Sequence, residues 1–222
     1  MSKIIIIGYP HSGTSILKTI ISHIDDVEHI IDETKKINIK TDKKFVVCKW
    51  PFALDEFFTE EYKDYKKIFI IRNPLFIFSS LNKRLNYKIP HHHNIDRYIN
   101  TLKKFIFYRN NKKDNIYTIR YEDLFGDSFK QLKNLLNNVG LKYEDDIFIN
   151  ENYKNYMKPN IENPTHKPKN SDHVLYRTWQ LNQPFESQNL PEKIDLLPEQ
   201  SDKIINNPTI LKVYPNIKSL IA

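Results

Sequence analysis

The chain has 222 residues, of which 40% are hydrophobic, and this length is enough for one domain with a core of ordinary size. No apolar run approaches the ~20 residues of a membrane span. The first strand begins at the N-terminus, which leaves no room for a signal peptide. The single cysteine, Cys48, excludes an internal disulfide, so we expect the protein to be located in the reducing cytoplasm. The net charge of +7 suits an anionic ligand, but the lysines are scattered and argue against a nucleic-acid partner.

The first stretch of the chain predicts a buried strand, a tight turn and a helix. Ile4 to Ile7 are four consecutive isoleucines, which indicate a strand buried on both faces of a parallel sheet. From Ile16 onward the apolar residues recur at helical spacing, up to about residue 25. The free N–H groups of such a turn converge with the helix N-terminus, and both favour negative charge. The stretch therefore predicts an anion-binding loop; the alternative is an ordinary strand-to-helix turn.

The following segments alternate between strands and helices up to about residue 140. Further strands are expected at 45–48, 67–71 and 116–121, and helices at 54–65, 74–85, 95–108 and 128–138. Residues 27–44 form a polar connection without a clear period, and Gly140 is a helix stop signal. This alternation predicts an α/β fold, a three-layer sandwich in which helices flank a central parallel sheet of about four to five strands.

Polar or basic residues follow each expected strand. Besides the loop after Ile7, they are Lys49, Arg72 and Tyr121. Ligands of parallel sheets bind beyond the carboxyl ends of the strands, so these residues predict a site at one edge. Arg72 and Ser80 lie on one side of a strand–helix junction, where a guanidinium and a hydroxyl can bind a phosphate. The alternative is that Arg72 pairs with a carboxylate.

Three motifs, in the same order along the chain, resemble those of the sulfotransferases. Residues 8–15, Gly-Tyr-Pro-His-Ser-Gly-Thr-Ser, resemble the phosphosulfate-binding loop, in which lysine or arginine usually stands at the position of His11. Residues 72–80, from Arg72-Asn73-Pro74 to Ser80, resemble the 3′-phosphate motif, with Phe76 replacing its aspartate. Residues 120–124, Arg-Tyr-Glu-Asp-Leu, resemble a motif whose tyrosine lies near the adenine. The match covers about residues 3–140 of a single domain, 1–222, and thins over an irregular C-terminal region, 150–222.

The resemblance implies a P-loop NTPase-like fold and a defined reaction. A sulfuryl group would move from 3′-phosphoadenosine 5′-phosphosulfate (PAPS) to a hydroxyl or amine of an acceptor, such as a carbohydrate or small molecule, leaving 3′-phosphoadenosine 5′-phosphate (PAP). Arg72 and Ser80 would bind the 3′-phosphate, Tyr121 would lie by the adenine, and no metal is required. The loop residues implied to bind the donor are Pro10, His11, Ser12, Gly13, Thr14 and Ser15.

The catalytic residues implied by the resemblance are Lys49 and His11. Lys49 precedes Trp50-Pro51 and resembles a family lysine beside the sulfuryl group; the alternative is a solvated lysine. The family's catalytic histidine or glutamate, next to that lysine, is absent. His11 therefore has two candidate roles: an imidazolium that replaces the usual lysine or arginine, which we favour, or the base that takes the acceptor's proton. Asp55 and Glu56 are further candidates for the base.

Two other segments carry weaker signals. His91, His92 and His93 are adjacent and cannot all face one metal ion, so we expect a solvated loop, with acceptor contact as the alternative. In the family, a late basic loop closes over the 3′-phosphate. Lys167, Lys169 and Arg177 are candidates for that role, but no motif assigns it to them.

Two other functions remain open at this stage. The first is a P-loop nucleotide kinase with a degenerate loop, although Thr14 occupies the position of the P-loop lysine. The second is a catalytically inactive protein that binds a nucleotide or nucleic acid. The sequence predicts neither the acceptor nor the oligomeric state.

Overall fold

The computed structural model describes residues 1–148, 175–176, 179 and 185–221. Five strands form one parallel sheet in the order β2-β3-β1-β4-β5. Their bounds are β1 (Ser2–Ile7), β2 (Val27–Glu33), β3 (Phe45–Trp50), β4 (Tyr65–Ile71) and β5 (Ile116–Arg120). The chain runs from β1 to β2 and β3 on one side and then crosses to β4 and β5 on the other. The order in which the chain adds strands reverses beside β1, while all strands stay parallel. The carboxyl end of this central strand is therefore the expected ligand position.

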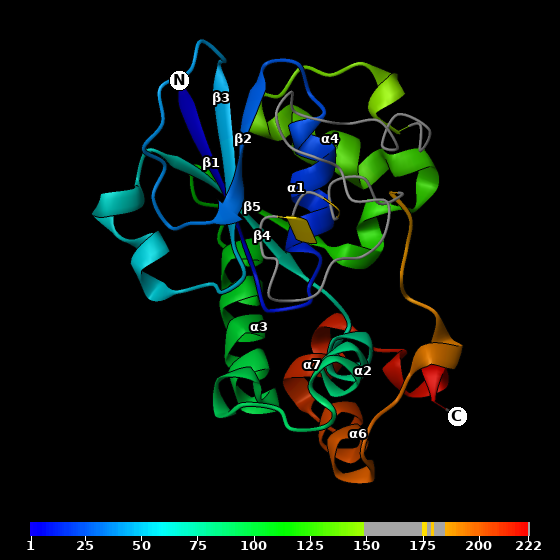
Figure 1. The fold of residues 1–222 in the computed structure, drawn as a ribbon. Coiled ribbons are helices and arrows are strands. Elements are labelled where there is room, and N and C mark those ends of the chain that lie inside the picture. The colour runs from blue at the N-terminus through cyan, green and yellow to red at the C-terminus, as the bar shows by residue number, and fades with distance from the viewer. Residues whose placement is uncertain (149–174, 177–178, 180–184, 222) are drawn as a thin grey trace.

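Helices cover both faces of the sheet (Figure 1). On one face lie α1 (Thr14–Ser22) and α4 (Lys130–Val139), and on the other lies α3 (Ile95–Asn110). Beyond the sheet, α2 (Pro74–Leu85) packs with α6 (Pro198–Ile205) and α7 (Pro208–Val213) against α3. The predicted three-layer α/β sandwich is therefore confirmed.

The isoleucines of β1 divide between the two cores, as a strand buried on both faces requires. Ile4 and Ile6 pack with α1 and α4, whereas Ile5 and Ile7 pack with α2 and α3. All four side chains are fully buried. β1 is therefore packed between the two cores, and its carboxyl end leads directly into the loop that follows.

Several local predictions are confirmed by their caps. Pro74 is the first residue of α2, and the side chain of Asn73 accepts a hydrogen bond from Leu75 N at 3.0 Å. Gly140 ends α4 with a left-handed backbone, φ 84°. No helix of the described residues is long and apolar enough to cross a membrane.

Two expectations are wrong. Residues 27–44 contain a strand, β2, that was expected to be a connection. It is an edge strand next to β3, and Ile30 and Ile31, its two consecutive apolar residues, are only half-buried. The buried apolar run that identified the other strands is therefore missing. Residues 54–65 form two 3₁₀ turns, Asp55–Phe58 and Glu60–Tyr62, instead of a helix. Thr59 lies between them in an extended conformation, although Phe57 and Tyr62 are buried as the spacing implied.

Candidate functional site

The loop between β1 and α1 is a compact turn closed by its own hydrogen bonds. Ser12 N donates to Tyr9 O at 2.9 Å, and Tyr9 N donates to Ser12 Oγ at 3.2 Å. His11 and Gly13 both have left-handed backbones, with φ of 66° and 96°. This geometry turns the chain directly into α1, whose first N–H groups have no partner within the helix. The turn therefore ends in a cluster of donors that suits an anion.

Both glycines of the loop are required by close contacts. A side chain at Gly8 would collide with the carbonyl oxygen of Ile70, and one at Gly13 would collide with the ring of Tyr121. The loop thus lies against β4 and against the turn after β5 with no space for a Cβ. The Gly-x₄-Gly spacing in the sequence reflects this packing as well as the turn itself.

Lys49 reaches the start of α1 from the end of β3. Its Nζ donates to Ser15 Oγ at 2.7 Å and to Glu33 Oε1 at 3.0 Å, and the residue is only 2% exposed. A buried ammonium without an acceptor would be costly, and Glu33, on the unexpected strand β2, supplies the counter-charge. The Lys49 charge is therefore held beside the first turn of α1, next to a residue of the loop motif.

His11 points from the loop toward α2. Its Nδ1 lies 2.7 Å from Ser80 Oγ, in hydrogen-bond contact. The pKa of His11 is lowered to about 3, first by burial and then by the positive charge of Arg84, Arg72, His93 and Lys49. In the absence of an anion, the imidazole is therefore neutral at pH 7.

Arg72 is buried between the loop and the C-terminal part of the chain. Its Nη1 donates to His11 O at 3.3 Å, and its guanidinium carbon lies 4.3 Å from the ring centroid of Tyr121. The residue is 8% exposed. Arg72, Ser80 and Tyr121, which belong to different motifs of the sequence, therefore lie together beside the loop.

The segment Phe185–Leu190 accepts two further hydrogen bonds from Arg72, and no pattern in the sequence pointed to it. Arg72 Nη2 donates to Gln188 O at 3.0 Å, and Arg72 Nε donates to Asn189 Oδ1 at 2.7 Å. Gln188 N donates to the hydroxyl of Tyr121 at 2.9 Å. These two acceptors and His11 O are all neutral, and Arg72 forms no ion pair with a carboxylate of the described residues.

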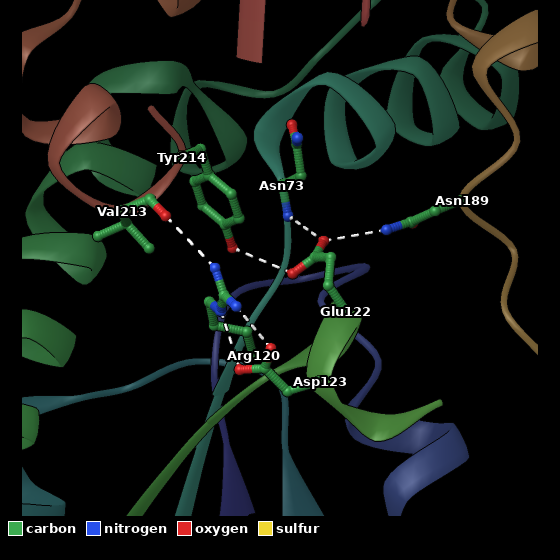
Figure 2. A network of polar contacts seen from close by, with 7 residues as sticks. All are labelled: Asn73, Arg120, Glu122, Asp123, Asn189, Val213 and Tyr214. Carbon is green, nitrogen blue, oxygen red and sulfur yellow. Dashed lines mark hydrogen bonds and ion pairs between the residues drawn. The ribbon is translucent and has the colours of Figure 1, made fainter. Parts of the chain in front are cut away.

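A buried carboxylate, Glu122, links this segment to the rest of the site (Figure 2). It accepts hydrogen bonds from Asn73 N at 2.8 Å, Asn189 Nδ2 at 3.0 Å and the Tyr214 hydroxyl at 3.4 Å. Burial raises the pKa of Glu122. Because the Asn189 amide joins Glu122 on one side and Arg72 on the other, Glu122 fixes the orientation of an Arg72 partner.

Arg120 and Asp123 form a neighbouring pair in the same view. Arg120 Nε donates to Asp123 Oδ2 at 2.9 Å, and its Nη1 donates to Val213 O at 3.5 Å. This pair connects the end of β5 to the end of α7. The third motif of the sequence, residues 120–124, thus also connects the sheet to the C-terminal helices.

The weaker candidates of the sequence lie elsewhere or outside the described residues. Asp55 pairs with Lys104 at 2.6 Å and Glu56 with Lys35 at 2.7 Å. Residues 91–93 form a 3₁₀ turn in which the His93 ring stacks on Phe52, with centroids 5.8 Å apart. Within the described part of the chain, no group of His, Cys, Asp or Glu is arranged to hold a metal ion. Lys167, Lys169 and Arg177 lie outside the described residues.

Fold and site together define an α/β protein with a tight loop, rich in N–H donors, at the carboxyl end of its central strand. Among solved structures, the mouse sulfotransferase SULT7A1 complexed with PAP is similar, with 19% sequence identity and a TM-score of 0.55 over 98% of this chain and 88% of that one. A retinol dehydratase in complex with retinol and PAP is 14% identical, with a TM-score of 0.50 over 99% of this chain and 81% of that one.

The chain therefore has the fold of the sulfotransferases. No family model matches the sequence. No curated protein matches it either.

Proposed function

We propose that this protein is a sulfotransferase that moves a sulfuryl group from PAPS to a hydroxyl or amine of an acceptor. One observation carries the proposal. Arg72 Nη1 lies 3.3 Å from the carbonyl oxygen of His11, so the guanidinium and the loop border the same space. One nucleotide with phosphates at both ends can therefore contact both groups.

The loop residues would hold the phosphosulfate end of the donor. Pro10 shapes the turn, Gly13 and the N–H groups at the start of α1 face the anion, and Ser12, Thr14 and Ser15 add hydroxyls. When bound, the donor supplies an activated sulfuryl group. The acceptor oxygen or nitrogen would then bond to that sulfur and lose its proton to water, while the bond from sulfur to the 5′-phosphate oxygen breaks and PAP leaves.

Lys49 would stabilise the negative charge that builds on the leaving phosphate oxygen. Its ammonium is already held at 2.7 Å from Ser15 Oγ, so little reorganisation is needed to reach an anion on the loop. Glu33 keeps the side chain extended toward α1 from the opposite side. These contacts support a catalytic role for Lys49 over that of a solvated lysine.

His11 would become an imidazolium when the donor binds. Burial and four nearby cationic or imidazole groups lower its pKa in the absence of a ligand, and the charges of a bound phosphosulfate act in the opposite direction. Binding should then take up a proton. A base role for His11 predicts the reverse, because the imidazole must stay neutral to accept the acceptor's proton.

Arg72, Ser80 and Tyr121 would recognise the 3′-phosphate and the adenine. Besides His11 O, Arg72 now donates to the neutral oxygens of Gln188 and Asn189. These two are the acceptors that a ligand could displace. A 3′-phosphate would replace them, because charge-assisted hydrogen bonds are stronger than neutral ones. Recognition of the 3′-phosphate would distinguish PAPS from ATP, and it needs no metal.

A thermal-shift measurement tests donor binding. PAP at a hundred times its dissociation constant should stabilise the protein by about 2.7 kcal/mol, a shift of several degrees, whereas ATP with Mg²⁺ should have little effect. Arg72→Lys should abolish the PAP shift, because lysine cannot replace the guanidinium contacts. Arg109→Lys, at an exposed position of α3, is the control and should retain it.

Transfer itself is tested with sulfate-labelled PAPS and a pool of acceptors. Labelled product that depends on Lys49 supports the proposal. Stabilisation by ATP with Mg²⁺ but not by PAP contradicts it and favours a nucleotide kinase. PAP binding without any transfer would identify an inactive nucleotide-binding protein instead.

A further inference from the structure

Two arginines, together with an aromatic ring, lie beside the loop on the side of α2 and α3, and neither the fold nor the donor accounts for them. Arg84 is in the last turn of α2, and Arg97 is in the first turn of α3. The guanidinium carbon of Arg97 lies 4.9 Å from the ring centroid of Phe52. The His93 ring stacks on the same Phe52 with an interplanar angle of 10°. Phe52 therefore holds a guanidinium and an imidazole together.

We call this group the Phe52 cluster (Phe52, Arg84, His93 and Arg97). Two hydrogen bonds fix the neighbouring chain segments to the loop. Ala53 N donates to Gly8 O at 2.8 Å, which fixes the chain next to Phe52. The Tyr9 hydroxyl donates to Asn94 O at 3.0 Å, which fixes the start of α3. Arg84 follows Ser80 by one helical turn, so it lies on the face of α2 that contacts His11.

Within the described part of the chain, the two arginines of the cluster have no carboxylate as a counter-charge. Nearby carboxylates are engaged elsewhere: Asp55 with Lys104 at 2.6 Å, Asp96 with Lys203 at 2.8 Å, and Asp195 with the Tyr87 hydroxyl at 2.6 Å. Among the described residues, neither Arg84 nor Arg97 forms an ion pair with a carboxylate.

The field of these arginines reaches the loop. Arg84 and His93 both contribute to the low pKa of His11, and Arg97 acts on the pKa of Tyr9 in the same direction. These interactions place positive charge next to the position of the transferred group. A second anion near that position would therefore meet Arg84 and Arg97, which form no ion pair with a carboxylate of the described chain.

We propose that the Phe52 cluster is the acceptor side of the site and selects an acceptor that already carries an oxyanion near its reacting hydroxyl or amine. This inference rests on the proposed sulfotransferase function. The donor is accommodated without the cluster, by the loop and Lys49 at one end and by Arg72 and Ser80 at the other. Arg84 is exposed and Arg97 is half-buried. A carboxylate or sulfate on the acceptor would pair with both guanidinium groups, whereas a neutral acceptor would gain no charge-assisted hydrogen bond from them.

Matched acceptors test the inference without knowledge of the natural one. Phenyl glucoside, phenyl glucuronide and phenyl glucoside 6-sulfate share a scaffold, and the last two carry a carboxylate and a sulfate. Binding of each to the PAP-saturated protein is measured by calorimetry. We expect both acids to bind about tenfold more tightly than the glucoside, a factor equal to about 1.4 kcal/mol. The preference should weaken at high salt.

A pair of double variants assigns the effect to the cluster. Arg84→Gln with Arg97→Gln should remove the preference for the acids. Lys40→Gln with Lys103→Gln removes the same charge from exposed positions that make no ion pair in the described chain, and it should retain the preference. Loss in both double variants would indicate a general charge effect and contradict the assignment.

The remaining outcomes separate this inference from the proposed function. If PAP stabilises the protein but the acids bind no better than the glucoside, or do not bind detectably, the inference is overturned and the proposed function stands. A difference between carboxylate and sulfate identifies the preferred oxyanion. If PAP does not bind at all, the proposed function is wrong, and the inference falls with it.

Discussion

Gly13 is the residue at which the loop is most tightly constrained. It combines a left-handed backbone, φ 96°, with a position against the ring of Tyr121 that leaves no room for a Cβ. Left-handed geometry alone costs an L-residue about 1–2 kcal/mol, and the contact with Tyr121 adds to it. The motif of residues 120–124 and the loop of residues 8–15 are therefore in direct contact through this glycine.

We expect Gly13→Ala to lower the free energy of unfolding by about 2 kcal/mol or more and to weaken PAP binding, because the Tyr121 ring or the loop must move. Gly126→Ala is the matched control. Gly126 has φ −81° and nothing within contact distance of an added Cβ, so stability should change by no more than about 0.5 kcal/mol. Urea denaturation of both variants measures the difference, and equal effects would contradict the contact.

The His11 side chain makes stability depend on pH in a predictable direction. Its pKa in the folded protein, about 3, lies below the ordinary value of 6.5, so between these values the unfolded chain binds the proton more readily. The contribution of neutral His11 to the free energy of unfolding is complete above pH 6.5 and is lost as the pH falls toward 3.

The replacement His11→Asn should therefore flatten the acid side of the stability profile. Between pH 6.5 and 4.5 the wild type should lose about 2 kcal/mol more than the variant. His91→Asn, at an exposed position of the neighbouring turn, should follow the wild type. Urea titrations at the two pH values measure this, and parallel losses for wild type and His11→Asn would show that His11 is not the responsible group.

At the scale of elements, Glu122 joins three separate segments: the start of α2, the segment Phe185–Leu190 and the residue after α7. Its carboxylate receives three donors, yet burial still raises its pKa. The extra stability that a raised pKa brings is present below the ordinary value of 4.5 and is lost as the pH rises through the folded value. The junction is thus strained electrostatically at neutral pH.

Glu122→Gln should relieve this strain while preserving the contacts, because the amide oxygen can accept from Asn73 N and Asn189 Nδ2. We expect the free energy of unfolding of the variant, relative to the wild type, to be more favourable at pH 8 than at pH 4.5. Glu192→Gln, at an exposed position, serves as the control and should show no such trend. A constant difference across this pH range would contradict the burial effect.

At the scale of the whole molecule, the C-terminal helices belong to the same core as α2 and α3. Ile204 and Ile210 are fully buried in that core. A polar contact supports the docking: Asn82 Nδ2 donates to Gln200 Oε1 at 2.8 Å and to Asp195 O at 3.0 Å. The helices α6 and α7 are therefore packed against α2 and α3, in the chain that follows the segment Phe185–Leu190, which contacts Arg72.

Ile210 is buried in the core that α7 shares with α2 and α3. Ile210→Ala should therefore lower the free energy of unfolding of the whole chain by about 2–5 kcal/mol. Ile39→Ala, at a position that is 37% exposed, is the matched control and should cost far less. Unfolding in urea is followed by circular dichroism and by tryptophan fluorescence. Two separate transitions would show that the C-terminal helices unfold independently of the sheet.

The sequence alone determined the parts of the fold that depend on local patterns. The isoleucines of β1, the strands β3, β4 and β5, the proline at the start of α2 and the stop at Gly140 all follow from short-range rules of burial and backbone geometry. The strand ends also placed Lys49, Arg72 and Tyr121 at one edge, because every strand of a parallel sheet points the same way. The two failures, β2 and residues 54–65, are segments whose conformation is set by their neighbours.

Only the tertiary structure decided which partners those residues have. Glu33 beside Lys49, Ser80 beside His11, and Gln188 and Asn189 on Arg72 are contacts between segments 16, 69, 116 and 117 residues apart. The charge state of His11 and the unpaired arginines of the Phe52 cluster depend on the same long-range packing. Local propensity acts over a few residues, whereas burial and charge depend on everything that folding brings near.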